Sequence, residues 1–124
     1  MAERKRILIA DDDADLVDLL KLELTRKGFD VVTAADGQEA LKLAREEKLD
    51  LVLLDVMMPG IDGYHVAQEL SKTLGEACPK MIIITCRDVS REQGLALMCG
   101  ASASIQKPIQ LAILHARIEE LLSK

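Results

Sequence analysis

Polar side chains that can bind cations or transfer groups stand at the ends of four short apolar runs. The runs cover residues 7–10, 51–54, 81–84 and 104–106. The polar residues that follow them are Asp11, Asp12, Asp55, Thr85 and Lys107. If the runs are parallel strands, their carboxyl ends meet at one edge of a sheet, where ligands of open α/β sheets bind. Carboxylate oxygens suit Mg²⁺, with Mn²⁺ as an alternative, so the pattern predicts a site for a divalent cation and a phosphoryl group.

Asp55 can do covalent chemistry by itself, because a carboxylate can attack phosphorus and form an aspartyl phosphate. Catalysis of phosphoryl transfer consists mainly of positioning and charge neutralisation. Lys107 would supply positive charge and Thr85 a hydrogen bond to a phosphoryl oxygen. The Lys107–Pro108 bond is a candidate for a cis peptide that aims this lysine. Asp13 is expected instead to cap the following helix, since three consecutive aspartates cannot all point into one pocket.

The apolar runs alternate with stretches of helical periodicity, which is typical of a parallel sheet covered by helices on both faces. A further strand is expected over residues 29–34. Helices are expected over residues 14–27, 38–47, 64–74, 90–99 and 110–122. The first helix should bury Leu16, Leu19, Leu20 and Leu24, and Gly28 should end it. No linker or repeat interrupts the alternation, so residues 1–124 are predicted to form a single α/β domain.

Composition narrows the classes of partner. The net charge is −5 and aromatic residues make up 2% of the chain, which argues against direct binding of nucleic acid. No apolar run is long enough for a membrane span. The cysteines (Cys78, Cys86 and Cys99) match no zinc pattern and are expected to be small buried thiols in a reducing compartment, the cytoplasm. The histidines, His65 and His115, are both expected to be solvated.

The set of motifs resembles the receiver domain of bacterial two-component response regulators over essentially the whole chain. The matching residues are Asp11-Asp12, Asp55 within the segment 53–63, Thr85 and Lys107-Pro108. The resemblance implies a flavodoxin-like doubly wound sheet of five parallel strands in the order 2-1-3-4-5. It also implies that Asp55 accepts a phosphoryl group from a histidine kinase or phosphotransfer protein. Asp12, Asp55 and the backbone carbonyl of Met57 would bind Mg²⁺, with Asp11 reaching it through water, and Thr85 and Lys107 would sense the phosphate. Such a domain is a phosphoacceptor that assists its own phosphorylation and dephosphorylation, not a dedicated enzyme.

The chain differs from the family in the region that would pass the signal to a partner. Receivers usually carry an aromatic residue three positions before the lysine, and here that position is Ser104. The acids that would pair with Arg117 across one type of dimer are missing from the segment 100–104, so that dimer is not expected. Leu95, Met98 and Ile113 fall outside the core stripes by their spacing. If the helix boundaries are misplaced by a few residues, these are ordinary core residues. Otherwise, as we hypothesise, helix four, strand five and helix five form an apolar docking face for a downstream protein. Val56, Met57 and Arg87 should flank the pocket and tune the phosphate lifetime.

Three other functions compete with this interpretation. A phosphorylation-independent receiver that serves as a scaffold is favoured by Ser104, and the intact set of acceptor residues argues against it. An aspartyl phosphohydrolase often needs a second acid two residues after its nucleophile, where this chain has Met57. A nucleotide-binding protein is disfavoured because no glycine-rich loop follows the first strand.

Overall fold

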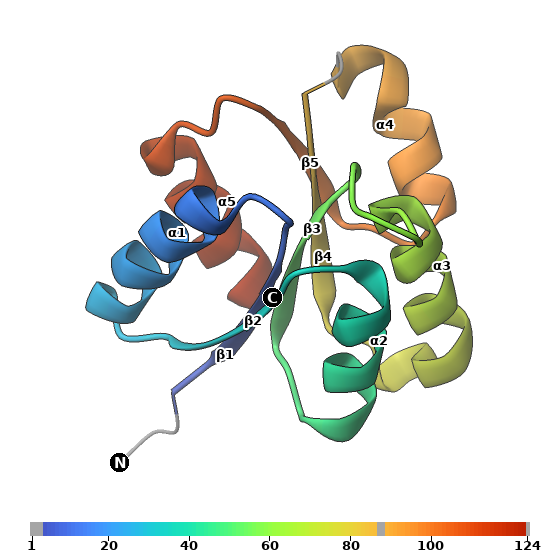
Figure 1. Ribbon diagram of the computed structural model, residues 1–124, viewed down its shortest axis with the longest axis horizontal. Helices are drawn as coiled ribbons and strands as arrows, with labels where there is room; N and C mark the ends of the chain where they lie inside the picture. Colours follow the sequence, from blue (N-terminus) through green and yellow to red (C-terminus); the bar gives the residue numbers. More distant parts are fainter. Residues whose placement is uncertain (1–3, 87–88, 124) are drawn as a thin grey trace.

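The computed structural model describes residues 4–86 and 89–123, and for residues 89–93 the backbone alone. Its centre is a five-stranded parallel sheet in the order β2-β1-β3-β4-β5, with helices on both faces (Figure 1). The strands are β1 (Arg6–Ala10), β2 (Asp30–Ala34), β3 (Leu51–Asp55), β4 (Lys80–Thr85) and β5 (Ala103–Gln106). The helices are α1 (Ala14–Arg26), α2 (Gly37–Glu46), α3 (Gly63–Leu74), α4 (Val89–Met98) and α5 (Leu111–Leu122), with a short 3₁₀ turn, η1 (Gly75–Ala77). The predicted fold class and strand order are confirmed.

Each face of the sheet carries its own hydrophobic core. Helices α1 and α5 cover one face, and α2, α3 and α4 cover the other (Figure 1). Successive residues of a strand point to opposite faces, so Ile7 and Ile9 pack toward α1 and α5, while Leu8 and Ala10 pack toward the other helices. Burial on both faces explains why the central strands are continuous apolar runs instead of alternating ones. The carboxyl ends of these buried strands are therefore held rigidly at one edge of the sheet.

Aspartates begin the first three helices. Their carboxylates each accept a hydrogen bond from a backbone N–H in the first turn, at 3.2 Å for Asp13, 2.8 Å for Asp36 and 2.8 Å for Asp62. This confirms Asp13 as a helix cap. At the other end of α1, Gly28 has a φ of +99°, and the N–H of Phe29 donates to the carbonyl of Leu24 at 3.1 Å. This left-handed glycine ends the helix as predicted.

Two expectations about the elements were wrong. Leu19 is 47% exposed and does not belong to the core stripe of α1, which Leu16, Val17, Leu20 and Leu24 form. Each helical residue turns by roughly 100°, and this rotation places Leu19 away from the mean direction of those four side chains. Asp55 and Thr85 do not follow their strands but are the last residues of β3 and β4. The hydrogen-bonded sheet itself therefore holds both backbones.

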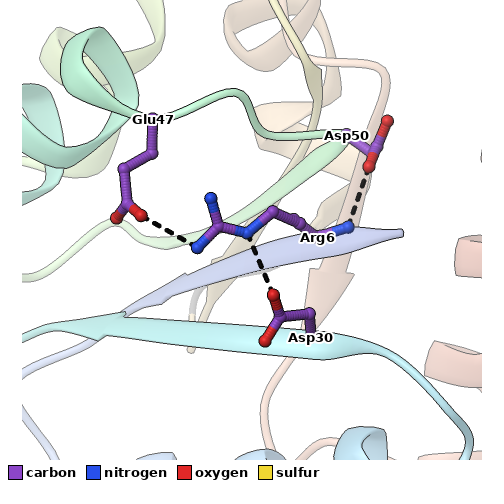
Figure 2. A network of polar contacts seen from close by, with 4 residues as sticks. All are labelled: Arg6, Asp30, Glu47 and Asp50. Carbon is purple, nitrogen blue, oxygen red and sulfur yellow. Dashed lines mark hydrogen bonds and ion pairs between the residues drawn. The ribbon is translucent and has the colours of Figure 1, made fainter. Parts of the chain in front are cut away.

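The opposite, amino-terminal edge of the sheet is tied together by Arg6 (Figure 2). Its Nη2 lies 2.8 Å from Oε1 of Glu47, which follows α2, and its Nε lies 3.2 Å from Oδ2 of Asp30 on β2. The backbone N–H of Arg6 donates to Oδ2 of Asp50 at 2.8 Å, and the N–H of Asp50 donates to the carbonyl of Arg6 at 2.9 Å. The hydrogen bond and charge of Glu47 raise the pKa of Arg6, against the opposing effect of burial. One side chain thus joins β1, β2 and the end of α2.

Replacing this arginine should cost stability. We expect Arg6→Gln to lower the free energy of unfolding by about 1–2 kcal/mol, because hydrogen bonds to charged partners are lost and two carboxylates lose their cation. The matched control is Arg26→Gln on α1. The side chain of Arg26 is 71% exposed, and its Nη1 lies 3.6 Å from Oε1 of Glu23. The control should cost less than about 0.5 kcal/mol. Urea unfolding at low salt measures both, and equal losses would contradict the structural role of Arg6.

Candidate functional site

The structure brings the three predicted carboxylates together at the carboxyl edge of the sheet. One oxygen each of Asp11, Asp12 and Asp55 lies within 4.8 Å of the other two. Asp11 and Asp55 are each only 3% exposed, whereas Asp12 faces solvent. β1 and β3 are adjacent strands in parallel register, with Ala10 beside Leu54, so the first residue after β1 and the last of β3 become neighbours. Adjacency in the sheet, not in the sequence, creates the cluster.

Lys107 provides a cation for this cluster. Its Nζ lies 3.1 Å from Oδ2 of Asp11 and 3.3 Å from Oδ1 of Asp55. The backbone N–H of Lys107 donates to the carbonyl of Thr85 at 2.7 Å, which joins the loop after β5 to the end of β4. Thr85 is fully buried, and the Lys107–Pro108 peptide bond is cis, as predicted. The structure thus gathers the carboxylates and the lysine, and it ties the lysine to the backbone of Thr85.

The electrostatics of the site favour a bound cation. Burial raises the pKa of Asp55 from 3.8 to about 6; repulsion from Asp11 adds to this, and the charge of Lys107 opposes it. Burial alone would lower the pKa of Lys107, but its contacts with Asp11 and then Asp55 outweigh burial and raise that pKa. One ammonium group therefore leaves negative charge uncompensated at Asp55, and further positive charge would be stabilising there.

The donor set fits Mg²⁺. Oδ1 of Asp11 accepts the N–H of Asp13 at 2.9 Å, whereas its buried Oδ2 has no hydrogen-bond partner among the described residues despite the nearby ammonium. A buried oxygen in this state is suited to a cation or its bound water. Met57, whose carbonyl is the remaining predicted ligand, is 55% exposed in the loop after β3. The role of that carbonyl stays a prediction.

Gly63 lets α3 begin directly against the site. A Cβ at this position would collide with the backbone carbonyl of Asp55. The N–H of Gly63 also donates to the carbonyl of Val56 at 3.1 Å, which closes the loop that follows β3. In the sequence this glycine appeared only as one of several turn residues in the loop. The sequence feature that could have identified it is its place directly after Asp62, the cap of α3, where the start of the helix packs against the backbone of Asp55.

The remaining candidate residues divide into confirmed and corrected ones. His65 is exposed as predicted, but His115 is half-buried, and its buried Nε2 has no hydrogen-bond partner in the described part of the chain. It was wrongly expected to be solvated; it lies on α5 beside the buried Leu114, one turn before Ile118, at the margin of the core stripe. Arg87 lies outside the described residues.

The apolar residues expected outside the core are indeed exposed. Leu95 is 44% exposed, Met98 84% and Ile113 46%. Leu97 of α4, which the sequence did not single out, is 59% exposed. Ser104 is half-buried on β5. Of the cysteines expected to be buried, Cys99 is buried and Cys78 half-buried, but the expectation was wrong for Cys86, which is exposed because it follows the end of β4. In the described residues, no helix is long and apolar enough to cross a bilayer.

Fold and site together define a doubly wound α/β domain with an acidic pocket at the carboxyl edge of its sheet. Residues 7–119 match the sequence model of the family described as the response regulator receiver domain. The chain therefore belongs to the response regulator receiver family, the phosphoacceptor domains of two-component signalling systems. Domains of this family are phosphorylated by histidine kinases and bind Mg²⁺ at an acidic pocket.

Individual relatives agree with this assignment. The chain is 38% identical over 120 residues to the alkaline phosphatase synthesis transcriptional regulatory protein PhoP of Bacillus subtilis, covering 97% of this chain and 49% of PhoP. It is 42% identical over 118 residues to the transcriptional regulatory protein AfsQ1 of Streptomyces coelicolor, covering 95% of this chain and 51% of AfsQ1. The chain thus spans about half the length of these relatives.

Solved structures show the same fold. A CheY-like receiver domain protein from Methanospirillum hungatei superimposes with a TM-score of 0.90 at 32% identity, covering 98% of this chain and 95% of that one. The response regulator TrrA from Thermotoga maritima, solved in complex with Mg²⁺ and BeF, superimposes with a TM-score of 0.85 at 35% identity. That match covers 94% of this chain and 98% of TrrA.

The raised pKa of Asp55 predicts a pH-dependent stability in the absence of metal. A group whose pKa rises on folding contributes stability that is complete below its unfolded pKa, 3.8, and lost as the pH rises through about 6. Asp55→Asn should remove this loss. The unfolding free energy of the variant, relative to the original chain, should therefore increase by on the order of 2–3 kcal/mol between about pH 4 and about pH 7. Urea unfolding with EDTA measures it; a difference that does not change with pH would contradict the burial of this carboxylate.

Gly63 should be intolerant of any side chain. Gly63→Ala must displace the carbonyl of Asp55 or the start of α3, and we expect a loss of about 1–3 kcal/mol together with weaker Mg²⁺ binding. Gly94→Ala in α4 is the matched control, because no atom lies within 4 Å of its added Cβ. The control should be neutral or stabilising by up to about 1 kcal/mol. Urea unfolding and calorimetric titration with Mg²⁺ test this, and similar behaviour of the two variants would refute the close approach.

Proposed function

We propose that Asp55 is the phosphoacceptor of this receiver domain and that Asp11, Asp12, Asp55 and the Met57 carbonyl form its Mg²⁺ site. The observation that carries the proposal is the buried Asp55 carboxylate, 3.3 Å from the ammonium of Lys107 and clustered with two other carboxylates. The donor would be a histidine kinase or a histidine phosphotransfer protein. The domain is an acceptor and switch that assists its own phosphorylation and dephosphorylation, and not a dedicated enzyme.

In the proposed reaction, a carboxylate oxygen of Asp55 attacks the phosphorus of a phosphohistidine. A new oxygen–phosphorus bond forms while the nitrogen–phosphorus bond breaks, and the electron pair returns to the imidazole nitrogen, which takes up a proton from solvent. Lys107 neutralises negative charge on the transferred group, and Thr85 donates a hydrogen bond to it. Bound Mg²⁺ supplies further positive charge for the phosphoryl oxygens, and Mn²⁺ has the same preference for oxygen ligands.

Phosphorylation would change the state of the domain through the groups that contact the new charge. Lys107 would exchange its contacts with Asp11 and Asp55 for phosphoryl oxygens, and its backbone bond to Thr85 links that change to β4 and β5. Differential contacts of this kind bias two pre-existing conformations. The exposed apolar residues on α4 and α5 support the α4-β5-α5 face as the docking surface for a downstream protein or domain. All three cysteines are free thiols, which supports the cytoplasm as the compartment.

A second candidate function is a scaffold that needs no phosphorylation. The observation that favours it is Ser104, a small half-buried residue on β5 at the position where the family usually has an aromatic ring. In that case the acceptor chemistry could be intact while the α4-β5-α5 face does not respond to it.

Phosphorylation by a small donor tests the acceptor directly. With acetyl phosphate and Mg²⁺, the chain should gain one phosphoryl group by intact-protein mass spectrometry, and EDTA or Asp55→Asn should abolish the gain. Asp13→Asn is the matched control and should be phosphorylated normally, because Asn caps helices as well as Asp does. Lys107→Ala should slow phosphorylation by about tenfold or more, through loss of positive charge.

Amide NMR with Mg²⁺ and beryllium fluoride, a phosphoryl mimic, separates the two functions. Shifts that spread from Asp55 to Ser104 and α4 support a switch. Shifts confined to the pocket support the scaffold. An Asp55→Asn variant that is still phosphorylated would refute the acceptor assignment.

A further inference from the structure

A hollow of about 390 Å³ opens between β5, the loop that follows it and α5. Its lining residues are Ser104, Ile105, Gln106, Lys107, Pro108, Gln110, Ile113 and Arg117. β5 is an edge strand that pairs only with β4, so the hollow lies at the open side of the sheet. This volume is within the range of roughly 300–1,000 Å³ that ligand sites occupy. It can hold a large side chain together with the backbone on either side of it.

The charged side chains that line the hollow are opposite in sign to the net charge of the protein. The protein carries a net charge of −5, yet the two charged residues among those eight, Lys107 and Arg117, are both cations. Nη1 of Arg117 lies 3.3 Å from Oε2 of Glu120, but both side chains are about half exposed, at 50% and 53%. Exposed pairs of this kind contribute little and exchange readily for another carboxylate. The lining is thus complementary to an anionic ligand.

The hollow also has an apolar wall that suits a ring. Ile113 is 46% exposed beside it, and Ile105 and Pro108 complete that wall. Neither aromatic residue of the chain fills the space: Tyr64 packs in the core on the α3 side of the sheet, and Phe29 packs against the core beneath α1 and α5. Ser104 contributes little volume, and the guanidinium of Arg117 can stack on an aromatic face.

The hollow is physically joined to the proposed acceptor site. Lys107 lines the hollow, and its Nζ is the group that contacts Asp11 and Asp55. Gln106, another lining residue, pairs in register with Thr85 at the end of β4. A ligand in the hollow would therefore contact the same lysine that contacts Asp55. By reciprocity, the state of Asp55 must alter the affinity for that ligand if Lys107 moves between the two states.

We propose that this hollow binds an acidic segment of a protein partner, which inserts an aromatic side chain beside Ser104 and places carboxylates near Arg117 and Lys107. The partner thus supplies an aromatic ring at the position where this chain has only Ser104. The binding site stands on the hollow and its charge alone, and its coupling to phosphorylation rests on the proposed function of Asp55.

A synthetic peptide serves as the probe. An acetylated and amidated peptide with one central phenylalanine and three glutamates on each side is titrated into the full chain and followed by amide NMR. We expect shifts at Ser104, Gln106 and Ile113 and an affinity about tenfold higher than that of two control peptides. One control replaces phenylalanine with alanine, and the other replaces the glutamates with lysines. Equal affinity for all three peptides, or shifts elsewhere on the surface, would overturn the proposal.

Variants of the chain test the lining. Ser104→Tyr places a ring in the hollow and should weaken peptide binding about tenfold, while the affinity for Mg²⁺ stays unchanged because Ser104 is not part of the metal site. Arg117→Glu should weaken binding to a similar extent, and Arg117→Lys should retain most of it. Unchanged peptide affinity in Ser104→Tyr and Arg117→Glu, with the fold intact by NMR, would refute the assignment.

Repeating the titration with Mg²⁺ and beryllium fluoride tests the coupling. We expect the peptide affinity to change at least threefold, and the change to vanish in Lys107→Ala. If beryllium fluoride shifts the resonances around Asp55 but leaves the peptide affinity unchanged, the coupling is wrong and the acceptor assignment stands. If the peptide binds but beryllium fluoride has no effect at Asp55, the proposed function fails and the hollow remains a binding site.

Discussion

The constraint that governs this site is the confinement of carboxylates at one edge of a buried sheet. Asp11 and Asp55 are held by β1 and β3, whose side chains are packed on both faces, so the two groups cannot move apart to relieve their repulsion. Lys107 compensates part of that charge, and the pKa of Asp55 is still raised to about 6. Hydrophobic burial supplies the free energy that keeps like charges together. The result is a site that gains stability from added positive charge, and that property supports the cation binding and phosphoryl acceptance proposed for it.

The charged side chains at the two edges of the sheet differ in how completely they are paired. At the amino edge, the guanidinium of Arg6 pairs with the carboxylates of Asp30 and Glu47, and the backbone N–H of Arg6 donates to Asp50 (Figure 2). At the carboxyl edge, the single ammonium of Lys107 lies 3.1 Å from the buried Oδ2 of Asp11 and 3.3 Å from Oδ1 of Asp55, so one cation is shared between two buried carboxylates. Satisfied groups stabilise the fold, whereas an incompletely satisfied buried group has a free-energy cost that a ligand can remove. This contrast distinguishes the charged groups around Arg6, which hold elements of the fold together, from those around Lys107, which are available to a ligand.

Lys107 connects the proposed acceptor site to the outer surface of the domain. Its ammonium contacts Asp11 and Asp55, its backbone N–H binds the carbonyl of Thr85, and its side chain lines the hollow beside Ser104. A change of charge at Asp55 would therefore act directly on a residue that also lines this hollow. Ile113 is exposed beside the hollow, and the small Ser104 leaves space in it. The proposed docking surface is thus open where a larger side chain at position 104 could have filled it.

The sequence alone predicted the element order, the sheet class, the caps at Asp13 and Gly28, and the cluster of Asp11, Asp12, Asp55 and Lys107 that the structure brings together. It could do so because strand periodicity and chain order place the ends of parallel strands at a common edge. It predicted the burial of Leu19 and His115 wrongly. Which side of a helix faces the core depends on how α1 and α5 pack against the sheet, and the sequence does not specify that orientation. Its resemblance to receiver domains supplied the strand order, which periodicity does not encode. Only the tertiary structure decided the distances from Lys107 to the carboxylates, the raised pKa of Asp55, the tight contact at Gly63 and the hollow beside Ser104. These properties depend on desolvation and on atoms far apart in the chain meeting within a few ångströms, and no local pattern of residues specifies them.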